Sequence, residues 1–525
     1  MDAPDFSRAS IKRYFSTRLS TLKPPKLTPE EKKLLNPFPT LALINKKTWL
    51  FIACAFCGWT WDAFDFFSVG LVAPKIAESL NRSVTDITWG ITLVLMLRSI
   101  GAVIFGVASD RYGRKWPFII NLVCFIALEL GSGFVQTYKQ FLGVRAIYGI
   151  AMGGLYGNAA ATALEDCPPQ ARGVISGVIQ SGYALGYLLC VVFTRAIADT
   201  SPYGWRALFW FGSGPPVLII IFRFFLPETE TYLASKASQE ESGIEKKFWN
   251  GLKITFKSYW LMFCYLVVLM AGFNFMSHGS QDLYPTMLKN QRQFSDDRST
   301  VTNCVANFGA MAGGLIIGHF STALGRRLTI MISCVIGGAL IYPWAFVHNS
   351  AGTNAGVFFL QFFVQGAWGV VPIHLSELSP PDLRSSMVGI AYQMGNLASS
   401  ASSTIEARIG ERFPLKNAHG EYQEGLYDYG KVMAILMGCV FGFVLIVTFV
   451  GPENRGALML TEDAQMMVDA ENKLDSEEKG DFENLERVDS DGKQVDNFIE
   501  EVPGPENTYT GSHPPHYDSA HYESK

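Results

Sequence analysis

The sequence predicts an all-α membrane protein with twelve transmembrane helices in two pseudo-symmetric six-helix bundles. Of the 525 residues, 49% are hydrophobic and only 17% are charged, whereas a soluble chain carries about 25% charged residues. The charged residues gather at both ends and in one central segment, which leaves apolar runs of roughly 20 residues that can span a bilayer. The second observation is an internal repeat with an offset of 212 residues.

Twelve apolar runs are the predicted spans. Basic residues in the short loops, such as Arg114 and Arg326, fall on one side, which marks that side as cytoplasmic. The even number of spans then places both termini in the cytoplasm. The spans cover about residues 48–74, 87–108, 116–135, 138–164, 172–196, 205–226, 258–283, 300–321, 327–347, 352–377, 384–407 and 430–450.

Two motifs define the repeat. The motif Gly-x6-Gly-Arg-(Lys/Arg) begins at Gly106 and again at Gly318. The motif Glu-x2-Pro-Pro-x2-Arg-x4-Gly begins at Glu165 and again at Glu377, so both second copies lie 212 residues after the first. Transporters built from parallel repeats bind substrate near the midplane, between the halves, and rock around it.

The repeat divides the chain into five segments. Residues 48–226 and 258–450 are the two six-helix bundles, and residues 227–257 are a cytoplasmic linker. Residues 1–47 hold ten Lys/Arg against four acids and are expected to be a solvated cytoplasmic tail. Residues 451–525 hold nineteen acids against six Lys/Arg, which predicts a disordered cytoplasmic tail. Its lysines suggest ubiquitin-ligase adaptors as partners of the tails, with simple solvation as the alternative.

The stretch from Asn274 to Thr286 closes the seventh span and is rich in polar groups. It places amides, hydroxyls, an imidazole and a carboxylate at membrane depth, where such groups are costly and usually line a substrate or ion pathway. In a helix, Asn274, His278 and Asp282 fall at i, i+4 and i+8 on one face. The alternative interpretation is polar contact between helices. The sequence therefore predicts a polar site in the middle of the protein.

The loop from residue 106 to 115 resembles the cytoplasmic loop signature of the major facilitator superfamily, and the degenerate second copy sits where that fold requires it. The resemblance implies that the arginine and glutamate of each half pair and latch the cytoplasmic side in the outward-facing state. Thr322 replaces the acid of the first copy, so the second loop is expected to lack one ionic contact. The implied gating residues are Asp110, Arg114, Glu165, Arg326 and Glu377.

Residues 274–286 are similar to the signature N-x-x-[ST]-H-x-[ST]-Q-D-x-x-x-T of the fungal Jen family of carboxylate/proton symporters, with all seven fixed positions present. The resemblance implies a plasma-membrane transporter of short-chain carboxylates, not an enzyme. It also implies substrate-handling positions in the second, fifth and eleventh spans. The predicted substrate-binding residues are Arg98, Asn274, Ser277, His278, Gln281, Gln180, Ser181, Gln393 and Asn396.

The chemistry of these side chains suits an anion that travels with a proton. Arg98 can hold a carboxylate through a two-pronged charge-assisted contact. Anion entry against an inside-negative potential costs about 2.3 kcal/mol per charge per 100 mV, and one co-transported proton cancels that charge. A structural role for Arg98 in a buried ion pair with Asp62, Asp65 or Glu129 stays an alternative, while Glu129 and Arg145 are expected to make a structural contact. The predicted proton-coupling residues are His278, Asp282, Asp62 and Asp65.

Gln180 suggests which carboxylate is carried. Monocarboxylate carriers of the Jen family tend to have Phe at the matching position, whereas dicarboxylate carriers tend to have a smaller or polar residue. We therefore favour succinate and malate, with lactate, pyruvate and acetate as the alternative. A nutrient sensor on a transporter fold is the alternative from another class, and a carrier of sialic or sugar acids is a third. The sequence has no phosphate-loop motif and no cluster typical of a hydrolase or metal site, so we expect no ATP drive, no cofactor, no metal and no nucleic-acid partner.

Overall fold

The computed structural model describes residues 7–24, 32, 35–241, 248–410, 412–416 and 422–456. These residues belong to one compact unit, Met1–Gln465. Within the described part, ten helices are long and apolar enough to cross a membrane. Two further predicted spans each consist of two shorter helices, so the twelve-helix architecture is confirmed. The predicted acidic tail lies outside the described residues from position 457 onward.

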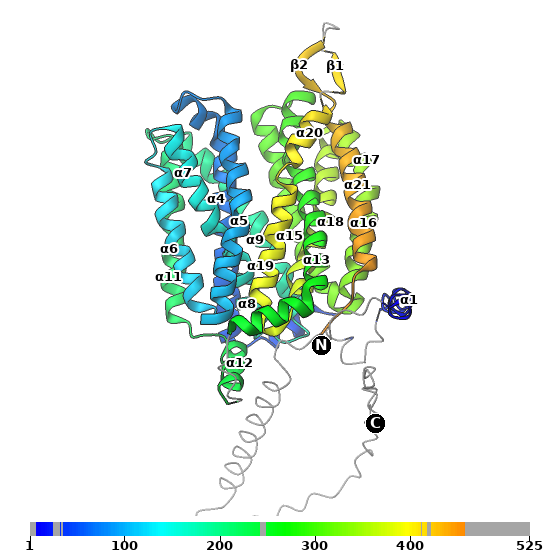
Figure 1. Cartoon of the computed structure of the whole chain (residues 1–525). Coiled ribbons are helices and arrows are strands. Elements are labelled where there is room, and N and C mark those ends of the chain that lie inside the picture. The colour runs from blue at the N-terminus through cyan, green and yellow to red at the C-terminus, as the bar shows by residue number, and fades with distance from the viewer. Residues whose placement is uncertain are drawn as a thin grey trace, which may run out of the picture. The chain divides into compact units, whose positions relative to one another are not determined.

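The first six spans form one half of the fold (Figure 1). The fourth span is interrupted at Gly154, where α7 ends and α8 begins. The helices are α4 (Lys46–Ser79), α5 (Val84–Tyr112), α6 (Lys115–Ser132), α7 (Tyr138–Gly153), α8 (Leu155–Leu164), α9 (Arg172–Phe193) continued by the π-helix η1 (Thr194–Ala198), α10 (Trp205–Gly212) and α11 (Gly214–Phe225).

The last six spans form the other half. The eleventh span is interrupted between α19 and α20, and a two-stranded antiparallel hairpin that the sequence did not predict precedes the last helix. The elements are α13 (Phe248–Gln281) with α14 (Tyr284–Thr286) and η2 (Met287–Gln291), α15 (Asp296–Leu324), α16 (Arg326–Ala339), α17 (Ile341–Phe346), α18 (Ser350–Leu378), η3 (Pro381–Leu383), α19 (Arg384–Ser399), α20 (Ser402–Gly410), β1 (Pro414–Lys416), β2 (Tyr422–Tyr427) and α21 (Tyr429–Val450).

In each half, a glycine lets two helices of that half touch through their backbones, and the two contacts are equivalent. A Cβ atom on Gly101 of α5 would lie 1.7 Å from the carbonyl oxygen of Ile150 on α7. A Cβ atom on Gly313 of α15 would lie 1.9 Å from the carbonyl oxygen of Phe362 on α18. Both pairs differ by the same 212 residues. Small residues at such crossings are typical of membrane helices, because dispersion and close packing hold the helices together in lipid.

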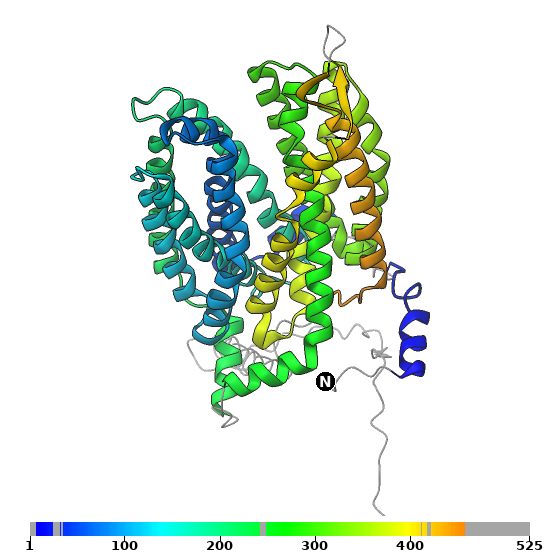
Figure 2. The same ribbon diagram turned by 45° about the horizontal axis from the view of Figure 1, so that its top comes forward.

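The two ends of the molecule differ in what they carry. The helix α12 (Glu230–Glu241), the start of α13 and the described N-terminal helix α1 (Arg8–Ser16) lie at one end, which we call the terminal face (Figure 1). The β1–β2 hairpin lies at the opposite end, which we call the hairpin face. The ribbons of the two halves lie close together toward the terminal face and spread toward the hairpin face (Figure 2).

The sharp turns at the terminal face repeat in both halves. Helices α5 and α15 end at Gly113 and Gly325, whose φ angles of 92° and 95° favour glycine. Carboxylates then occupy the first turns of the following helices. Glu228 accepts from the backbone N–H of Lys115 at 3.0 Å, and Glu453 accepts from the backbone N–H of Arg326 at 3.0 Å. Acids are favoured there by the free N–H groups and the dipole of the helix.

The N-terminal segment departs from the expected solvated tail. Arg18 is buried, and its Nη1 donates to the carbonyl oxygen of Gly451 after α21 at 2.7 Å. The hydroxyl of Tyr14 donates to the carbonyl oxygen of Val450 at 2.9 Å. Arg327 in turn donates to the hydroxyl of Thr21 at 3.0 Å. The prediction failed here because the partners are carbonyl groups at a helix end, which leave no mark in the sequence.

Candidate substrate and proton site

A pocket lies between the two halves and is lined by helices α4, α5, α9, α13, α18 and α19. The free space between its side chains is about 10 Å³, roughly the room of one water molecule. The pocket is therefore contracted around its polar groups. Six of the nine predicted substrate-binding residues line it, namely Arg98, Gln180, Asn274, Ser277, His278 and Asn396.

Arg98 is the cation of this pocket. Its side chain is 4% exposed, and Nη2 lies 3.5 Å from Oδ2 of Asp62 on α4. The guanidinium also lies 4.9 Å from the ring centroid of Phe66 and contacts the sulfur of Met152. Its Nε has no hydrogen-bond partner among the described residues. Arg98 is thus held by one long ion pair and has an N–H group that can still donate a hydrogen bond. The geometry therefore allows both predicted roles of Arg98, the ion pair with Asp62 and the binding of a substrate anion.

His278 and Asp282 form the second ionisable pair. The Nδ1 atom of His278 lies 3.0 Å from Oδ2 of Asp282, as the i, i+4 spacing predicted. The side chain of His278 is 9% exposed and that of Asp282 is 34% exposed. One member of the pair therefore lines the pocket while the other is one-third exposed, which is an arrangement suited to moving a proton between the two.

Amide groups complete the pocket wall. Asn274 donates to the carbonyl oxygen of Met270 in its own helix at 2.8 Å. Asn396 donates to Oε1 of Gln393 at 2.9 Å. The side-chain oxygen of Gln180 is buried and has no hydrogen-bond partner among the described residues. Gln180 and Asn396 thus face the pocket from opposite halves of the molecule.

Three predicted substrate-binding residues do not line the pocket. The hydroxyl of Ser181 donates to the carbonyl oxygen of Val178 in its own helix. Gln281 donates to Gln361 on α18 at 3.1 Å, inside the second half. Gln393 accepts a hydrogen bond from the side chain of Asn396 and so orients this lining residue. The resemblance to the Jen family made them candidates, but here their side chains bond within their own helix or to a neighbouring helix of the same half.

Sequence reasoning missed the aromatic part of the pocket, whose wall includes Tyr183, Trp368 and Tyr392. The rings of Tyr156 on α8 and Tyr392 on α19 stack at 4.0 Å, and Trp59 lies 4.9 Å from Tyr156. Trp368 and Tyr183 flank Tyr392 and Trp59 respectively. The Tyr156–Tyr392 stack joins the two halves. The only available signal was the presence of aromatic residues in runs already rich in them, so the sequence could not single these rings out.

The predicted gating residues of the first half meet at the terminal face. Arg114 contacts both carboxylate oxygens of Glu165, at 2.7 and 3.2 Å, and donates to Asp110 at 2.9 Å. Asp110 also accepts from the backbone N–H groups of Ser385 and Ser386, at 3.2 and 2.9 Å. Those two residues belong to the first turn of α19, so a carboxylate of one half caps a helix of the other half.

The second half repeats this arrangement with one difference. Arg326 contacts both oxygens of Glu377 at 3.0 Å. Where the first half has Asp110, Arg326 meets the hydroxyl of Thr322 at 3.2 Å. The ionic contact that the sequence predicted to be missing is therefore replaced by a hydrogen bond to an uncharged hydroxyl. Among these described loops, Asp110 of the first half caps a helix of the other half and its counterpart Thr322 carries no carboxylate, so the latch between the halves is asymmetric.

Arg114 keeps its charge in this latch. Burial disfavours the charged guanidinium, but the carboxylates of Glu165 and Asp110 outweigh burial, and the pKa of Arg114 is raised above its ordinary value. An arginine with a raised pKa does not titrate at physiological pH. The latch is therefore insensitive to pH through this residue.

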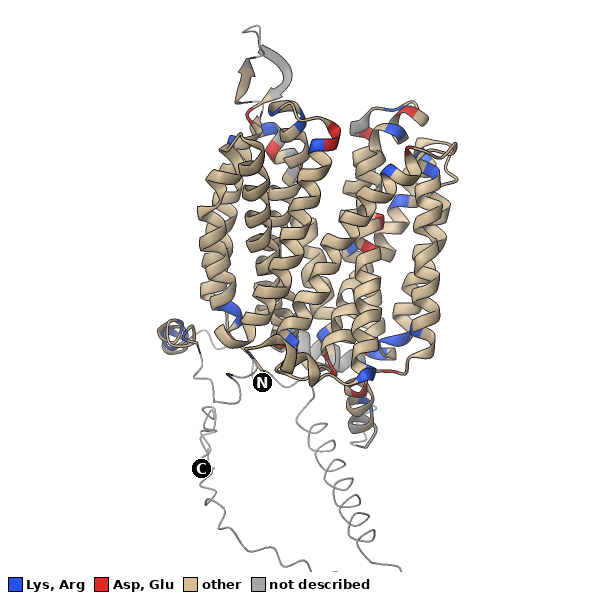
Figure 3. Ribbon diagram, turned by 180° about the vertical axis from the view of Figure 1, so that it is seen from behind, with Lys and Arg blue, Asp and Glu red and all other residues tan. Residues whose placement is uncertain are grey.

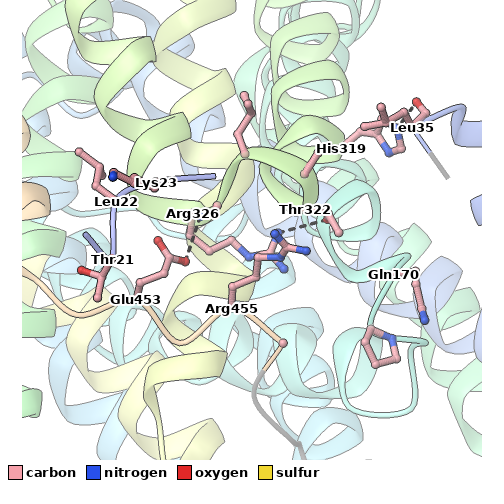
Figure 4. A pocket seen from close by; sticks show the side chains of 15 residues that line it. Thr21, Leu22, Lys23, Leu35, Gln170, His319, Thr322, Arg326, Glu453 and Arg455 are labelled. Carbon is pink, nitrogen blue, oxygen red and sulfur yellow. Dashed lines mark hydrogen bonds between the residues drawn. The ribbon is translucent and has the colours of Figure 1, made fainter. Parts of the chain in front are cut away.

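A larger pocket among the described residues lies elsewhere. About 470 Å³ of free space lies at the terminal face between the N-terminal segment, the α8–α9 loop, the α15–α16 turn and the residues after α21 (Figure 4). His319 borders it and lies 2.9 Å from the carbonyl oxygen of Leu35. None of the predicted substrate-binding or proton-coupling residues lines this cavity, so the contracted pocket between the halves is the candidate transport site.

Within the described residues, no group of three or more His, Cys, Asp or Glu side chains has a geometry that could hold a metal ion. The polar pocket is instead built from one guanidinium, one imidazole and several amides, and it lies between two helical halves. These features define a polytopic membrane transporter with a central site.

Comparisons with known proteins agree with this class. A family model described as Major Facilitator Superfamily matches residues 25–403. The carboxylic acid transporter protein homolog of Saccharomyces cerevisiae is 42% identical over 469 residues, which cover 86% of this chain and 76% of that protein. A probable 4-methylmuconolactone transporter of Cupriavidus pinatubonensis is 26% identical and covers 78% of this chain and 91% of its own length. The solved structure of the proton:xylose symporter XylE superposes with a TM-score of 0.62 at 18% identity, covering 80% of this chain and 98% of that chain.

The chain belongs to the major facilitator superfamily and, within it, to the fungal Jen family that the motif in the seventh span predicted. It is a transporter fold and not an enzyme.

Proposed function

We propose that the protein carries short-chain carboxylates together with protons across the plasma membrane by alternating access. One observation carries the proposal, namely that Arg98 with Asp62 and His278 with Asp282 meet in or beside one pocket between the halves. A relative at 42% identity that is described as a carboxylic acid transporter homolog supports the substrate class.

The Arg98–Asp62 pair suggests how substrate and proton are linked. At 3.5 Å the pair is longer than a good charge-assisted hydrogen bond, so a substrate carboxylate can compete for the guanidinium. Asp62, which is 2% exposed, would then be left without its cation. A buried carboxylate without a partner is costly and takes up a proton instead. Binding of the anion and binding of a proton thus favour each other.

The His278–Asp282 pair suggests where a proton enters the second half. Its two members span the path from the pocket to water, as their exposed fractions of 9% and 34% indicate. We infer that Asp282 collects the proton and that His278 passes its charge to the pocket, where the anion lies.

Gln180 favours dicarboxylates over monocarboxylates. It lies in the wall of the pocket with a free amide oxygen, and its amide nitrogen can donate to a second carboxylate. An aromatic side chain at this place would remove that donor. Succinate and malate are therefore the proposed substrates, and lactate, pyruvate or acetate are the alternative that the experiment below distinguishes.

The conformation corresponds to an outward-facing or occluded state if the terminal face is cytoplasmic, as the basic residues near it favour. In that orientation both termini are cytoplasmic, the Asp110–α19 latch closes the inner side, and ubiquitin-ligase adaptors would reach the tails. Opening of this latch would release the substrate and the proton into the cell.

The decisive experiment is uptake of labelled succinate and labelled lactate at pH 5 and pH 7, in cells that lack their own carboxylate carriers. We expect saturable succinate uptake that is faster at pH 5 and is abolished by a protonophore. Arg98→Ala and His278→Ala are expected to abolish it at equal surface abundance. Arg412→Ala and His348→Ala are matched controls, because both residues are exposed and remote from the pocket.

Each other outcome has a defined meaning. Preference for lactate would shift the proposal to monocarboxylates. Uptake that ignores the protonophore and pH would remove proton coupling while keeping the carboxylate substrate. No uptake of either label by protein at the cell surface would overturn the transport proposal and favour a sensor or another substrate.

A further inference from the structure

The first half contains more buried ionisable groups than the proposed mechanism has used so far. Asp65 lies one turn after Asp62 on α4, Glu129 lies on α6 and Arg145 on α7, and all are at most 2% exposed. Arg145 Nη1 lies 3.4 Å from Oε2 of Glu129. Figure 3 shows charged residues mostly at the helix ends, with a few acidic and basic turns midway along the helices of this half.

The charges in this cluster do not balance. Three carboxyl groups (Asp62, Asp65 and Glu129) face two guanidinium groups (Arg98 and Arg145), and the two ion pairs leave Asp65 over. Both oxygens of Asp65, and Oε1 of Glu129, have no hydrogen-bond partner among the described residues. A buried carboxylate without a cation or donor is strongly disfavoured. One proton within the cluster removes this cost.

A second, independent feature points to a shared site. Gly212 at the end of α10 lies beside both acids, and a Cβ atom there would be 3.0 Å from Oδ1 of Asp65 and 3.4 Å from Oε1 of Glu129. The two unpartnered oxygens therefore border the same small space, which exists because residue 212 has no side chain. The buried hydroxyl of Tyr148, which also lacks a hydrogen bond of standard geometry, interacts electrostatically with both acids.

We propose that Asp65 and Glu129 share one transported proton in the space beside Gly212, at a site separate from the His278–Asp282 pair. This inference rests on the proposed function and adds a proton count to it. A dicarboxylate dianion needs two protons for electroneutral entry. One proton would enter through the His278–Asp282 pair and compensate Asp62 when the anion takes Arg98, and the other would travel with this pair of acids in the first half.

The proton moves as follows. It arrives from outer water and binds a carboxylate oxygen of Asp65 or Glu129, so the cluster becomes neutral while Arg98 and Arg145 stay charged. It leaves to inner water after the halves have rocked. The titratable and charged groups around Asp65 and Glu129 are Asp62, Arg98, Arg145, Tyr148 and, from α9, Cys190. The sulfur of Cys190 lies 3.6 Å from the hydroxyl of Ser68. While Arg98 is paired with Asp62 and Arg145 with Glu129, each arginine holds one ionised carboxylate, and the proton shared by Asp65 and Glu129 is the one that the cluster exchanges.

The test measures protons per substrate in proteoliposomes with purified full-length protein, from succinate uptake and the simultaneous change in internal pH. We expect two protons per succinate in the wild type and one in Asp65→Asn, whose amide imitates the protonated acid. Steady-state accumulation should then fall about tenfold per pH unit of gradient, because each coupled proton contributes a factor of ten per unit. Succinate exchange without a gradient needs no net proton movement and should remain measurable.

Gly212→Ala provides a second variant, because its methyl group enters the shared space without removing a charge. It is expected to slow gradient-driven uptake more than exchange. Asp296→Asn is the matched control, since its side chain is 75% exposed and its ion pair with Lys289 stays within the second half. If Asp65→Asn is too unstable to purify, infrared spectra of the wild type and Glu129→Gln decide, because a protonated buried carboxyl should be visible only in the wild type.

The outcomes separate this inference from the proposed function. If the wild type does not transport succinate, the proposed function itself is overturned. Transport with one proton per succinate, unchanged by Asp65→Asn, keeps the proposed function and overturns the second proton site. Two protons in both the wild type and Asp65→Asn would also overturn it, because the second proton would then bind elsewhere.

Discussion

Arg98 combines two tasks that a lysine could not combine. Its planar guanidinium can turn one edge to Asp62 and the other to a substrate carboxylate, whereas an ammonium is a point charge. We expect Arg98→Lys to retain surface abundance but to raise the KM for succinate roughly ten- to hundredfold, since a lost charge-assisted hydrogen bond costs about 1.5–3 kcal/mol. Uptake kinetics at pH 5 measure this change in KM. An unchanged KM would mean that the substrate does not bind the two edges of the guanidinium.

Gln180 offers the sharpest test of substrate choice. Gln180→Phe removes an amide from the pocket wall and narrows the pocket, so succinate should lose about 1.5–3 kcal/mol of binding while lactate loses little. The ratio of succinate to lactate uptake should fall at least tenfold. Asn274→Ala is a useful comparison, because this amide already bonds to its own helix and its loss should weaken both substrates alike. A ratio that does not change would remove Gln180 from specificity.

At this scale the sequence predicted some contacts well and others not at all. The His278–Asp282 pair followed from helix spacing, which is local geometry, whereas the Arg114–Glu165 pair followed from the resemblance of the loop to the signature of the major facilitator superfamily. Ser181 and Gln281 were assigned to the pocket by the resemblance to the Jen family. Whether such a side chain faces the pocket depends on the rotation of its helix within the bundle. That rotation is fixed by packing against helices distant in sequence.

The latch at the terminal face is a contact between elements. Asp110 of α5 caps α19 of the other half, and an acid at a helix N-terminus contributes about 0.3–2 kcal/mol. We expect Asp110→Asn to shift the equilibrium toward opening of this face by up to roughly 30-fold. Thr322→Ala, which removes only a neutral contact, should shift it much less. Reactivity of single cysteines placed along the inner path measures the opening, and equal effects of both variants would contradict the asymmetric latch.

The aromatic stack forms a second barrier behind the latch. Tyr156 and Tyr392 lie eight or nine residues from Glu165 and Arg384 along their helices, which corresponds to about 12–14 Å at 1.5 Å per residue. The stack therefore lies between the pocket and the terminal face. The sequence could not predict this barrier, because the two rings belong to different halves and meet only when the halves are closed.

The two halves behave as copies at the scale of the whole molecule, and a matched pair of substitutions tests this. Gly101→Ala and Gly313→Ala each drive a methyl group into a backbone carbonyl of the same half. We expect both to destabilise the folded protein by about 4 kcal/mol or more, as strong overpacking does. Gly131→Ala and Gly438→Ala are controls, since a Cβ at these sites has no atom within 4 Å. Thermal unfolding of the purified variants measures the effect.

The fold as a whole was predictable because a repeated hydropathy pattern, two repeated loop motifs and a fixed offset agree with one another. The contacts of residues 14–21 with the second half were not predictable. They depend on carbonyl groups after α21, which every chain possesses and no sequence pattern marks.

The N-terminal segment is a covalent tether between the first half and the surface of the second half. Leu35 contacts His319 of the second half, and the short helix α3 (Pro37–Ala42) lies between this contact and α4. A helix can lengthen when it unwinds, because an extended residue covers about 3.3–3.6 Å and a helical residue only 1.5 Å. Unwinding of α3 would lengthen the tether by roughly 11–13 Å while the Leu35–His319 contact stays intact. The backbone amides of residues 38 and 40–42, the positions of α3 that are not proline, should accordingly exchange hydrogen faster during turnover than at rest. The same rate in both conditions would mean that the Leu35–His319 contact breaks instead.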